Sequence, residues 1–112
     1  MTPLYFHNPR CTKSREGLAL LESLNRPVQI KLYLNDGITE KEAQQLVRLY
    51  EGDKVDLIRP KEAKDCGVDV EKLKTDEAIA KALVAHPQIL QRPVLLSESR
   101  AVIGRPVERL GE

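Results

Sequence analysis

The sequence is poor in the residues on which metal centres, disulfide frameworks and base-stacking surfaces depend. Its 112 residues include no tryptophan, one phenylalanine, one methionine, two histidines and two cysteines. The histidines and cysteines show no recognisable metal-ligand spacing, and two distant cysteines do not make a disulfide framework. Aromatic residues are too few and too scattered to stack nucleic-acid bases. We therefore expect reduced thiols, no metal and no nucleic-acid partner.

The chain also lacks a charge excess and a long apolar run. Eighteen basic residues against seventeen acidic ones leave a net charge of +1, so any preference for anions has to be local. The beginning of the chain lacks the features of a signal peptide, and no apolar run approaches the ~20 residues that span a bilayer. These absences predict a cytoplasmic protein that does not interact with a membrane. The length fits a single domain over residues 1–112.

The first third of the chain predicts a β-α-β unit. The apolar run 4–6 is ended by a turn pair at residues 8 and 9 and is typical of a short strand. Leucines at near-helical spacing predict a helix over 12–25, and alternation over 28–32 predicts a half-buried strand. The two strands are expected to be parallel, with a right-handed crossover.

The rest of the chain predicts helices followed by a β-hairpin. Thr39 and Glu42 have the spacing of a capping box for a helix that ends near Gly52. Pro60 could begin a short helix and Gly67 could follow its end. Further patterns predict a helix from residue 75 to 86, strands at 94–96 and 101–103, and a last helical turn over 106–110. We expect an α/β fold in which a small mixed sheet is flanked by helices, in the order β-α-β, helical insert, β-β-α.

The most unusual stretch surrounds Cys11. The predicted strand and helix place this cysteine at the helix N-terminus, where unpaired N–H groups and the helix dipole favour a thiolate. Arg10, Lys13 and Arg15, with His7 as a further candidate, are expected to lower its pKa below the ~8.5 of a free thiol. A buried packing role is the alternative for a lone cysteine, but these charges favour a reactive thiol. The same N–H groups could hold an oxyanion.

The spacing from Cys11 to Ser14 is that of thiol redox motifs, with serine in place of the second cysteine. A disulfide cannot form within this loop, so a resolving thiol has to come from glutathione, another protein or Cys66. The Ser14 hydroxyl could bind the thiolate or an oxyanion, or could cap the helix, and both roles remain open. Cys66 is expected to be structural.

Four Arg-Pro pairs stand out among only seven prolines. A residue before proline is restricted to extended backbone angles, which lowers the entropy lost when its side chain binds an anion. The planar guanidinium group suits oxyanions. Arg26 follows a predicted helix and is most simply a surface residue, whereas the other three stand at junctions that could border a site: Arg59, Arg92 and Arg105. Pro93 opens a predicted strand, where a cis peptide bond is possible.

These motifs, taken in order, resemble the arsenate reductase family of the thioredoxin-like fold, in its glutaredoxin-dependent type. The stretches that carry the resemblance are Tyr5 to Cys11 with Ser14 and Arg15, Leu32 to Leu34, Leu57 to Arg59, His86 to Pro87 with Gln91 to Pro93, and Ile103 to Pro106. Arg10 departs from the family, because well-studied resistance enzymes have a small residue there.

The resemblance implies a site and a reaction. Cys11 would attack arsenate, and the oxyanion would be held by three arginines: Arg59, Arg92 and Arg105. His7 would help to lower the thiol pKa, and Ser14 and Arg15 would belong to the active-site loop, where Arg15 is expected to assist substrate binding. Glutathione would then attack the thiol-arsenate adduct, and glutaredoxin would complete the reduction to arsenite. No tightly bound cofactor is expected.

Two other functions are considered: a redox regulator and a reductase of the phosphatase type. The same fold includes Spx-like redox regulators, which act by binding a protein partner and usually carry two cysteines in the loop. A phosphatase-type arsenate reductase needs arginine six residues after the cysteine, where this chain has Gly17. The regulator therefore remains the alternative function, and the phosphatase-type enzyme is set aside.

Overall fold

A four-stranded mixed sheet forms the centre of the molecule in the computed structural model, which describes residues 2–112. The strands are β1 (Leu4–Phe6), β2 (Gln29–Lys31), β3 (Val94–Leu96) and β4 (Ala101–Ile103), in the order β2-β1-β3-β4. β1 pairs in parallel with β2 and antiparallel with β3, and β3 and β4 form the antiparallel hairpin. The predicted β-α-β unit and hairpin are both confirmed.

The two faces of the sheet belong to different cores because successive side chains of a strand point to opposite sides. Tyr5, Leu95 and Val102 pair across the strands and pack with Leu21 and Leu110. These last two lie on α1 (Thr12–Ser23) and on the 3-10 helix η4 (Val107–Gly111), which cover this face. The neighbouring side chains on these strands point the other way, into the larger core beneath the other helices. They are Phe6, Val94 and Ile103.

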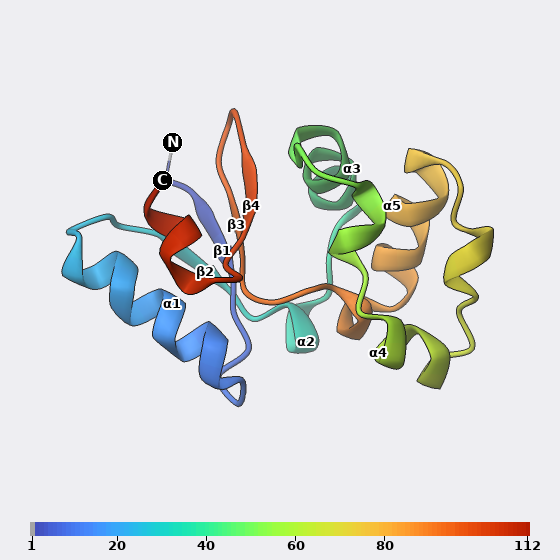
Figure 1. Cartoon of the computed structure of the whole chain (residues 1–112), viewed down its shortest axis with the longest axis horizontal. Coiled ribbons are helices and arrows are strands. Elements are labelled where there is room, and N and C mark those ends of the chain that lie inside the picture. Colours follow the sequence, from blue (N-terminus) through green and yellow to red (C-terminus); the bar gives the residue numbers. More distant parts are fainter. Residues whose placement is uncertain (1) are drawn as a thin grey trace.

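The helices between β2 and β3 lie on the opposite side of the sheet from α1 (Figure 1). They are α2 (Tyr33–Asp36), α3 (Glu40–Leu49), α4 (Pro60–Asp65) and α5 (Asp76–Ala85), with 3-10 turns η1 (Lys54–Leu57), η2 (Val70–Lys72) and η3 (Pro87–Ile89). α3 packs against α5. We call residues 33–92 the helical half and residues 2–32 with 93–112 the sheet half.

Local signals in the sequence set the ends of two of these helices. The Thr39 hydroxyl accepts from the Glu42 N–H at 3.1 Å, and the Glu42 carboxylate accepts from the Thr39 N–H at 2.9 Å, which completes the predicted capping box. α4 begins at Pro60 as predicted and ends before Gly67, whose φ of 77° is favourable for glycine.

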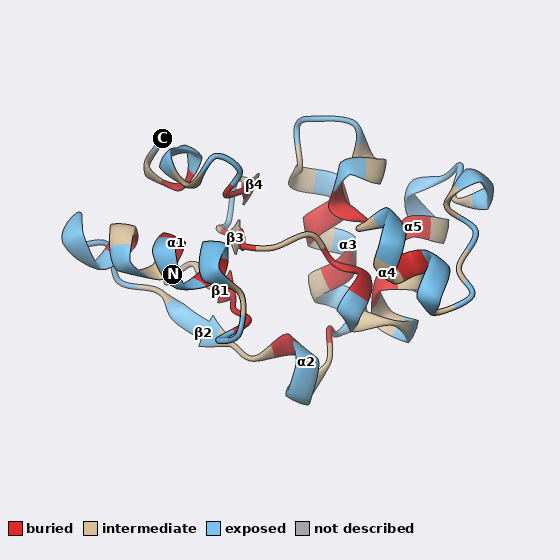
Figure 2. Ribbon diagram, turned by 60° about the horizontal axis from the view of Figure 1, so that its bottom comes forward, coloured by how far each residue is buried: buried red, intermediate tan, exposed pale blue. Residues whose placement is uncertain are grey.

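The predicted half-buried strand at 28–32 differs from the observed β2. Each residue of β2 is exposed or partly exposed (Figure 2). Ile30 is 47% exposed. The alternating pattern suggested one covered face, but β2 is an edge strand and α1 covers the sheet further in. The short helix α2 was not predicted, because four residues are too few for a helical period to be recognised.

None of the helices formed by residues 2–112 combines the length and the apolar character that a transmembrane span requires.

Candidate active site

The loop between β1 and α1 holds Cys11 at the N-terminus of the helix. The Asn8 side chain accepts the N–H of Arg10 at 3.0 Å, and its backbone carbonyl accepts the N–H of Cys11 at 3.0 Å. These bonds turn the chain so that α1 starts at Thr12 with Cys11 as its N-cap residue. The Cys11 side chain is partly exposed, so a reagent in solution can reach it.

The surroundings of Cys11 favour its thiolate. Burial by itself would raise the pKa of the thiol, but the Ser14 N–H, the Arg92 guanidinium and the Lys13 N–H outweigh it. The pKa of Cys11 is therefore lowered from its usual value. Two of these groups belong to the first turn of α1, where N–H groups lack partners within the helix. The third comes from a residue 81 positions later in the sequence.

His7 acts in a different way from the one the sequence suggested. Burial and the nearby charge of Arg15 lower the pKa of His7 from 6.5, so its ring is uncharged at neutral pH. Its Nδ1 lies 2.8 Å from the Ser14 hydroxyl oxygen, which also accepts the Asn8 N–H at 3.0 Å. An uncharged ring cannot stabilise a thiolate as a cation would. His7 instead fixes Ser14, which is fully buried, and with it the first turn of α1.

Arg15 braces the same loop from outside. Its guanidinium donates to the Pro9 carbonyl at 2.8 Å and to the Thr12 hydroxyl at 3.3 Å. These bonds join the loop to the first turn of α1. In the structure the Arg15 side chain is thus engaged with the protein itself, on an exposed surface.

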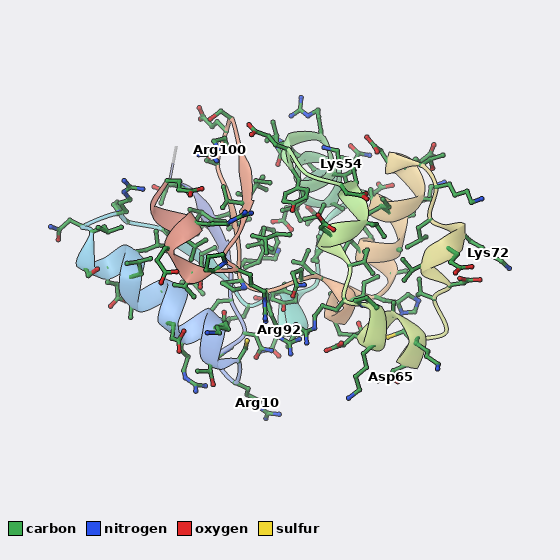
Figure 3. All side chains as sticks on the ribbon, in the orientation of Figure 1. Arg10, Lys54, Asp65, Lys72, Arg92 and Arg100 are labelled. Atoms are coloured by element: carbon green, nitrogen blue, oxygen red, sulfur yellow. The ribbon has the colours of Figure 1, made fainter. Side chains whose placement is uncertain are left out.

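Arg59 and Arg92, 33 positions apart in the sequence, meet through a short antiparallel contact between Ile58 and Leu90. The Arg59 N–H donates to the Ile89 carbonyl at 2.7 Å, which continues this contact. The Gln91 side-chain oxygen then accepts from the Arg59 guanidinium at 3.0 Å and from the Arg92 N–H at 3.2 Å. Figure 3 shows Arg92 between the sheet half and the helical half. The two predicted oxyanion-binding arginines therefore lie together.

The carboxylate of Glu62, whose role was not predicted from the sequence, lies between these arginines. Glu62 accepts from Arg59 Nε at 2.8 Å and forms an ion pair with Arg92 Nη1 at 3.6 Å, both through Oε2. Burial acts to raise the pKa of Glu62, but bonds to Arg59 and to its own N–H, and the charges of both arginines, lower it overall. Lysines are mixed with acidic residues from position 61 to 74, and nothing in this mixture marked Glu62 in the sequence.

Tyr33 is the second residue whose role the sequence did not predict. The side chain is fully buried, and its hydroxyl has no hydrogen-bond partner within residues 2–112. The charges that act on its pKa after burial are those of Arg92, Cys11 and Arg59. A close side-chain approach of Arg92 lowers this pKa as well, so the hydroxyl lies beside the Arg92 guanidinium. Leu32 to Leu34 was a recognisable motif, but nothing in the sequence indicated which way the ring points.

Arg105 is joined to the site through the backbone. Its Nε donates to the Arg92 carbonyl at 2.8 Å, and its side chain is exposed. The peptide bonds Arg92-Pro93 and Arg105-Pro106 are both cis. Its side-chain hydrogen bond connects Arg105 to Arg92.

Other features of the molecule lie apart from this loop. Cys66 follows α4, as expected, and its sulfur accepts from the Gln88 side chain at 3.0 Å. Within residues 2–112 no three histidine, cysteine or acidic side chains gather as metal ligands would. A hollow of about 740 Å³ lies between α3 and α5, and its lining residues include neither Cys11 nor the arginines of the site.

Comparison with known proteins places this geometry in a family. An arsenate reductase from Neisseria meningitidis serogroup A is 34% identical over 94% of this chain and 92% of that protein. An arsenate reductase structure from Vibrio cholerae has a TM-score of 0.81 at 31% identity, over 98% of this chain and 95% of that one. The global transcriptional regulator Spx 2 of Bacillus anthracis is 30% identical over 84% of this chain and 72% of the regulator.

Residues 6–112 match the ArsC family, and the α/β fold with its four-stranded mixed sheet matches the thioredoxin-like structures of that family. The chain belongs to the ArsC family.

Proposed function

We propose that this protein reduces arsenate to arsenite through a thiol-arsenate adduct on Cys11, with glutathione and glutaredoxin as the sources of electrons. The observation that carries the proposal is the position of Cys11. Cys11 is partly exposed, its pKa is lowered, and the lowering groups include Arg92, beside Arg59. A thiolate next to guanidinium groups is suited to attack an oxyanion, which those groups would hold.

The proposed cycle needs one thiol of this protein. The Cys11 thiolate attacks arsenic and displaces one oxygen, which leaves as water after protonation. Glutathione then displaces a second oxygen as water, so that arsenic carries both sulfurs. A glutaredoxin thiol attacks the glutathione sulfur, the two electrons of the arsenic–sulfur bond reduce As(V) to As(III), and a glutathione–glutaredoxin disulfide forms. Hydrolysis of the remaining bond releases arsenite and restores the Cys11 thiol.

A hollow beside the Cys11 loop supports glutathione as the co-substrate. It measures about 330 Å³ and is lined by residues 7–10 on one wall and by Leu32, Leu34 and Asn35 on the other. Arg10 supplies a cation at its rim, near the lower end of the sheet half in Figure 3. A tripeptide with two carboxylates fits a small hollow with an arginine beside it. Because glutathione and glutaredoxin are intracellular reductants, this proposal also implies a cytoplasmic location.

The test is arsenite formation by purified protein supplied with arsenate, glutathione and glutaredoxin. We expect arsenite release that stops in Cys11→Ser and continues in Cys66→Ser, since Cys66 lies outside the site. Absence of arsenite with both reductants present would reject arsenate as the substrate, whereas equal activity in Cys11→Ser would reject the nucleophile.

An Spx-like regulator is the alternative, and the similarity to Spx 2 favours it. Position 14 of this chain is serine, so the loop has no second thiol and an internal disulfide switch cannot operate there. The serine is fully buried and bonded to His7 and Asn8. A regulator would have to act through binding alone. Recovery of RNA polymerase with the purified protein, unchanged in Cys11→Ser, together with no arsenite formation, would favour this function.

A further inference from the structure

The site contains an unusual set of buried polar atoms without partners. Among residues 2–112, the buried side-chain nitrogens and oxygens that lack a hydrogen bond are the Tyr33 hydroxyl, Arg92 Nε and Glu62 Oε1. Glu62 and Arg92 form an ion pair, and the charge of Arg92 acts on the pKa of Tyr33, so the three belong to one place. Buried polar groups normally find partners, because leaving them unpaired is costly. A cluster of three indicates that a ligand supplies the missing bonds.

The chemistry of the three atoms defines what such a ligand must carry. Burial raises the pKa of Tyr33, so its hydroxyl keeps its proton and can donate a hydrogen bond. Arg92 Nε is also a donor. Glu62 is ionised at neutral pH, so its Oε1 can only accept. The complementary ligand presents at least two acceptor oxygens and one hydroxyl donor.

Protonated oxyanions have this pattern. Arsenate and phosphate keep at least one hydroxyl near neutral pH and also offer several acceptor oxygens. Sulfate is fully deprotonated and offers acceptors only. If sulfate entered the same place, one of its oxygens would face Glu62 Oε1 with no proton between them, which leaves both groups unpaired in a buried setting.

We infer that Glu62 and Tyr33 make this site selective for oxyanions that carry a hydroxyl: Glu62 accepts a hydrogen bond from that hydroxyl, while Tyr33 and Arg92 donate hydrogen bonds to the other oxygens. The inference rests on the proposed function for the location of the anion and adds the class of anion that binds. An ion-pair role for Glu62 accounts for Oε2, which both arginines contact, but it leaves Oε1 unexplained.

The test measures anion binding at Cys11 without any turnover. In a Cys66→Ser background, Cys11 is the one remaining thiol, and its rate of alkylation by iodoacetamide is followed at pH 7 and constant ionic strength. Phosphate or sulfate is added, and the concentration of each that halves the rate is recorded. Phosphate serves as the probe because it shares the hydroxyl and charge of arsenate and cannot be reduced by thiols.

We expect phosphate to protect Cys11 at about one-tenth of the sulfate concentration or less, and Glu62→Gln to bring the two concentrations close together, because glutamine can donate to sulfate. Tyr33→Phe should weaken protection by both anions and leave their ratio unchanged. Asp65→Asn removes a carboxylate from the same helix at an exposed position and should leave both values as in the parent.

Equal protection by the two anions in the parent, protection by neither, or an unchanged ratio in a folded Glu62→Gln variant would overturn the inference. The parent ratio requires no Glu62 substitution, so the test survives a variant that does not fold. The outcome is separable from the proposed function: selective protection without arsenite formation would reject the reductase and keep the selectivity. Arsenite formation without selective protection would keep the reductase function and reject the selectivity.

Discussion

The sheet half and the helical half contribute to the site in different ways. The sheet half supplies the nucleophile, and it lowers the thiol pKa of Cys11 with backbone groups of the adjoining helix turn. The helical half supplies side chains: Tyr33 reaches the site from α2, Glu62 from α4, and Arg59 from the residue before α4. Arg92, where the two halves join, lowers the pKa of Cys11 through its side chain.

This difference separates activation of the thiol from recognition of the anion. Activation depends on groups within three residues of Cys11 and on Arg92. Recognition depends on groups that the fold gathers from distant segments through the contact between Ile58 and Leu90. Changes in the helical half should therefore affect anion binding while the thiol pKa stays low, except at Arg92.

The largest effect is expected where the two halves meet. Arg92→Ala removes a guanidinium that faces both the sulfur and the expected anion, so kcat/KM for arsenate should fall about 10²- to 10³-fold. Arg59→Ala removes a contact on the helical side only and should cost about tenfold. Steady-state arsenite formation by the two variants measures the difference. Equal losses would mean that Arg92 has no special position.

Substitution at Arg10 should separate the reductant from the anion. Arg10→Ala removes the cation beside the hollow of residues 7–10, 32, 34 and 35, so KM for glutathione should rise severalfold. KM for arsenate should stay within about twofold, because the proposed anion contacts come from Arg59 and Arg92, which this substitution leaves in place. Varying each substrate in turn provides the measurement. A rise in KM for arsenate alone would contradict this division.

Packing beneath α1 is expected to matter more than helix propensity. A Cβ at Gly17 would overlap the Tyr5 hydroxyl oxygen and lie 2.7 Å from Leu110 Cδ1. Overpacking of this kind costs about 1–3 kcal/mol, and the better helix propensity of alanine offsets about 1 kcal/mol. Gly17→Ala should therefore lower the free energy of unfolding in urea by up to about 2 kcal/mol. An increase in stability would show that the contact of α1 with the sheet is looser than the structure indicates.

A matching change in the helical half should affect stability alone. Thr39→Ala removes the capping box of α3 and should cost about 1 kcal/mol of unfolding free energy in urea. Arsenite formation per folded molecule should stay unchanged, since Thr39 contacts Glu42 and no residue of the site. Loss of activity in the folded variant would argue that α3 influences the site.

The smallest effect is expected from the pH dependence at His7. Its pKa in the folded protein is lowered from 6.5, so the unfolded chain binds more protons just below that pH. Stability should therefore rise with pH through this window and fall as pH drops below 6.5. Urea midpoints at pH 7 and pH 5.5 should differ less in His7→Gln than in the parent. An equal difference in both would place the titration at another group.

The sequence was informative where short-range rules apply and silent where distant segments meet. The capping box, Pro60 at the start of α4 and the position of Cys11 follow from local backbone chemistry, and the structure has all three. Arg59 and Arg92 were recognised as a set from their motifs. Glu62 was missed because one carboxylate in a mixed-charge segment carries no sign of which arginines it will meet.

Titration of the Cys11 thiolate is the most direct test of this account. Thiolate absorbance in the Cys66→Ser background gives the pKa of Cys11, and the measurement is repeated in Arg92→Ala and Arg59→Ala. We predict a pKa below that of an ordinary thiol, a clear rise in Arg92→Ala and little change in Arg59→Ala. A pKa at or above the ordinary value, unaffected by Arg92→Ala, would contradict the claim that a helix N-terminus and Arg92 together activate this thiol.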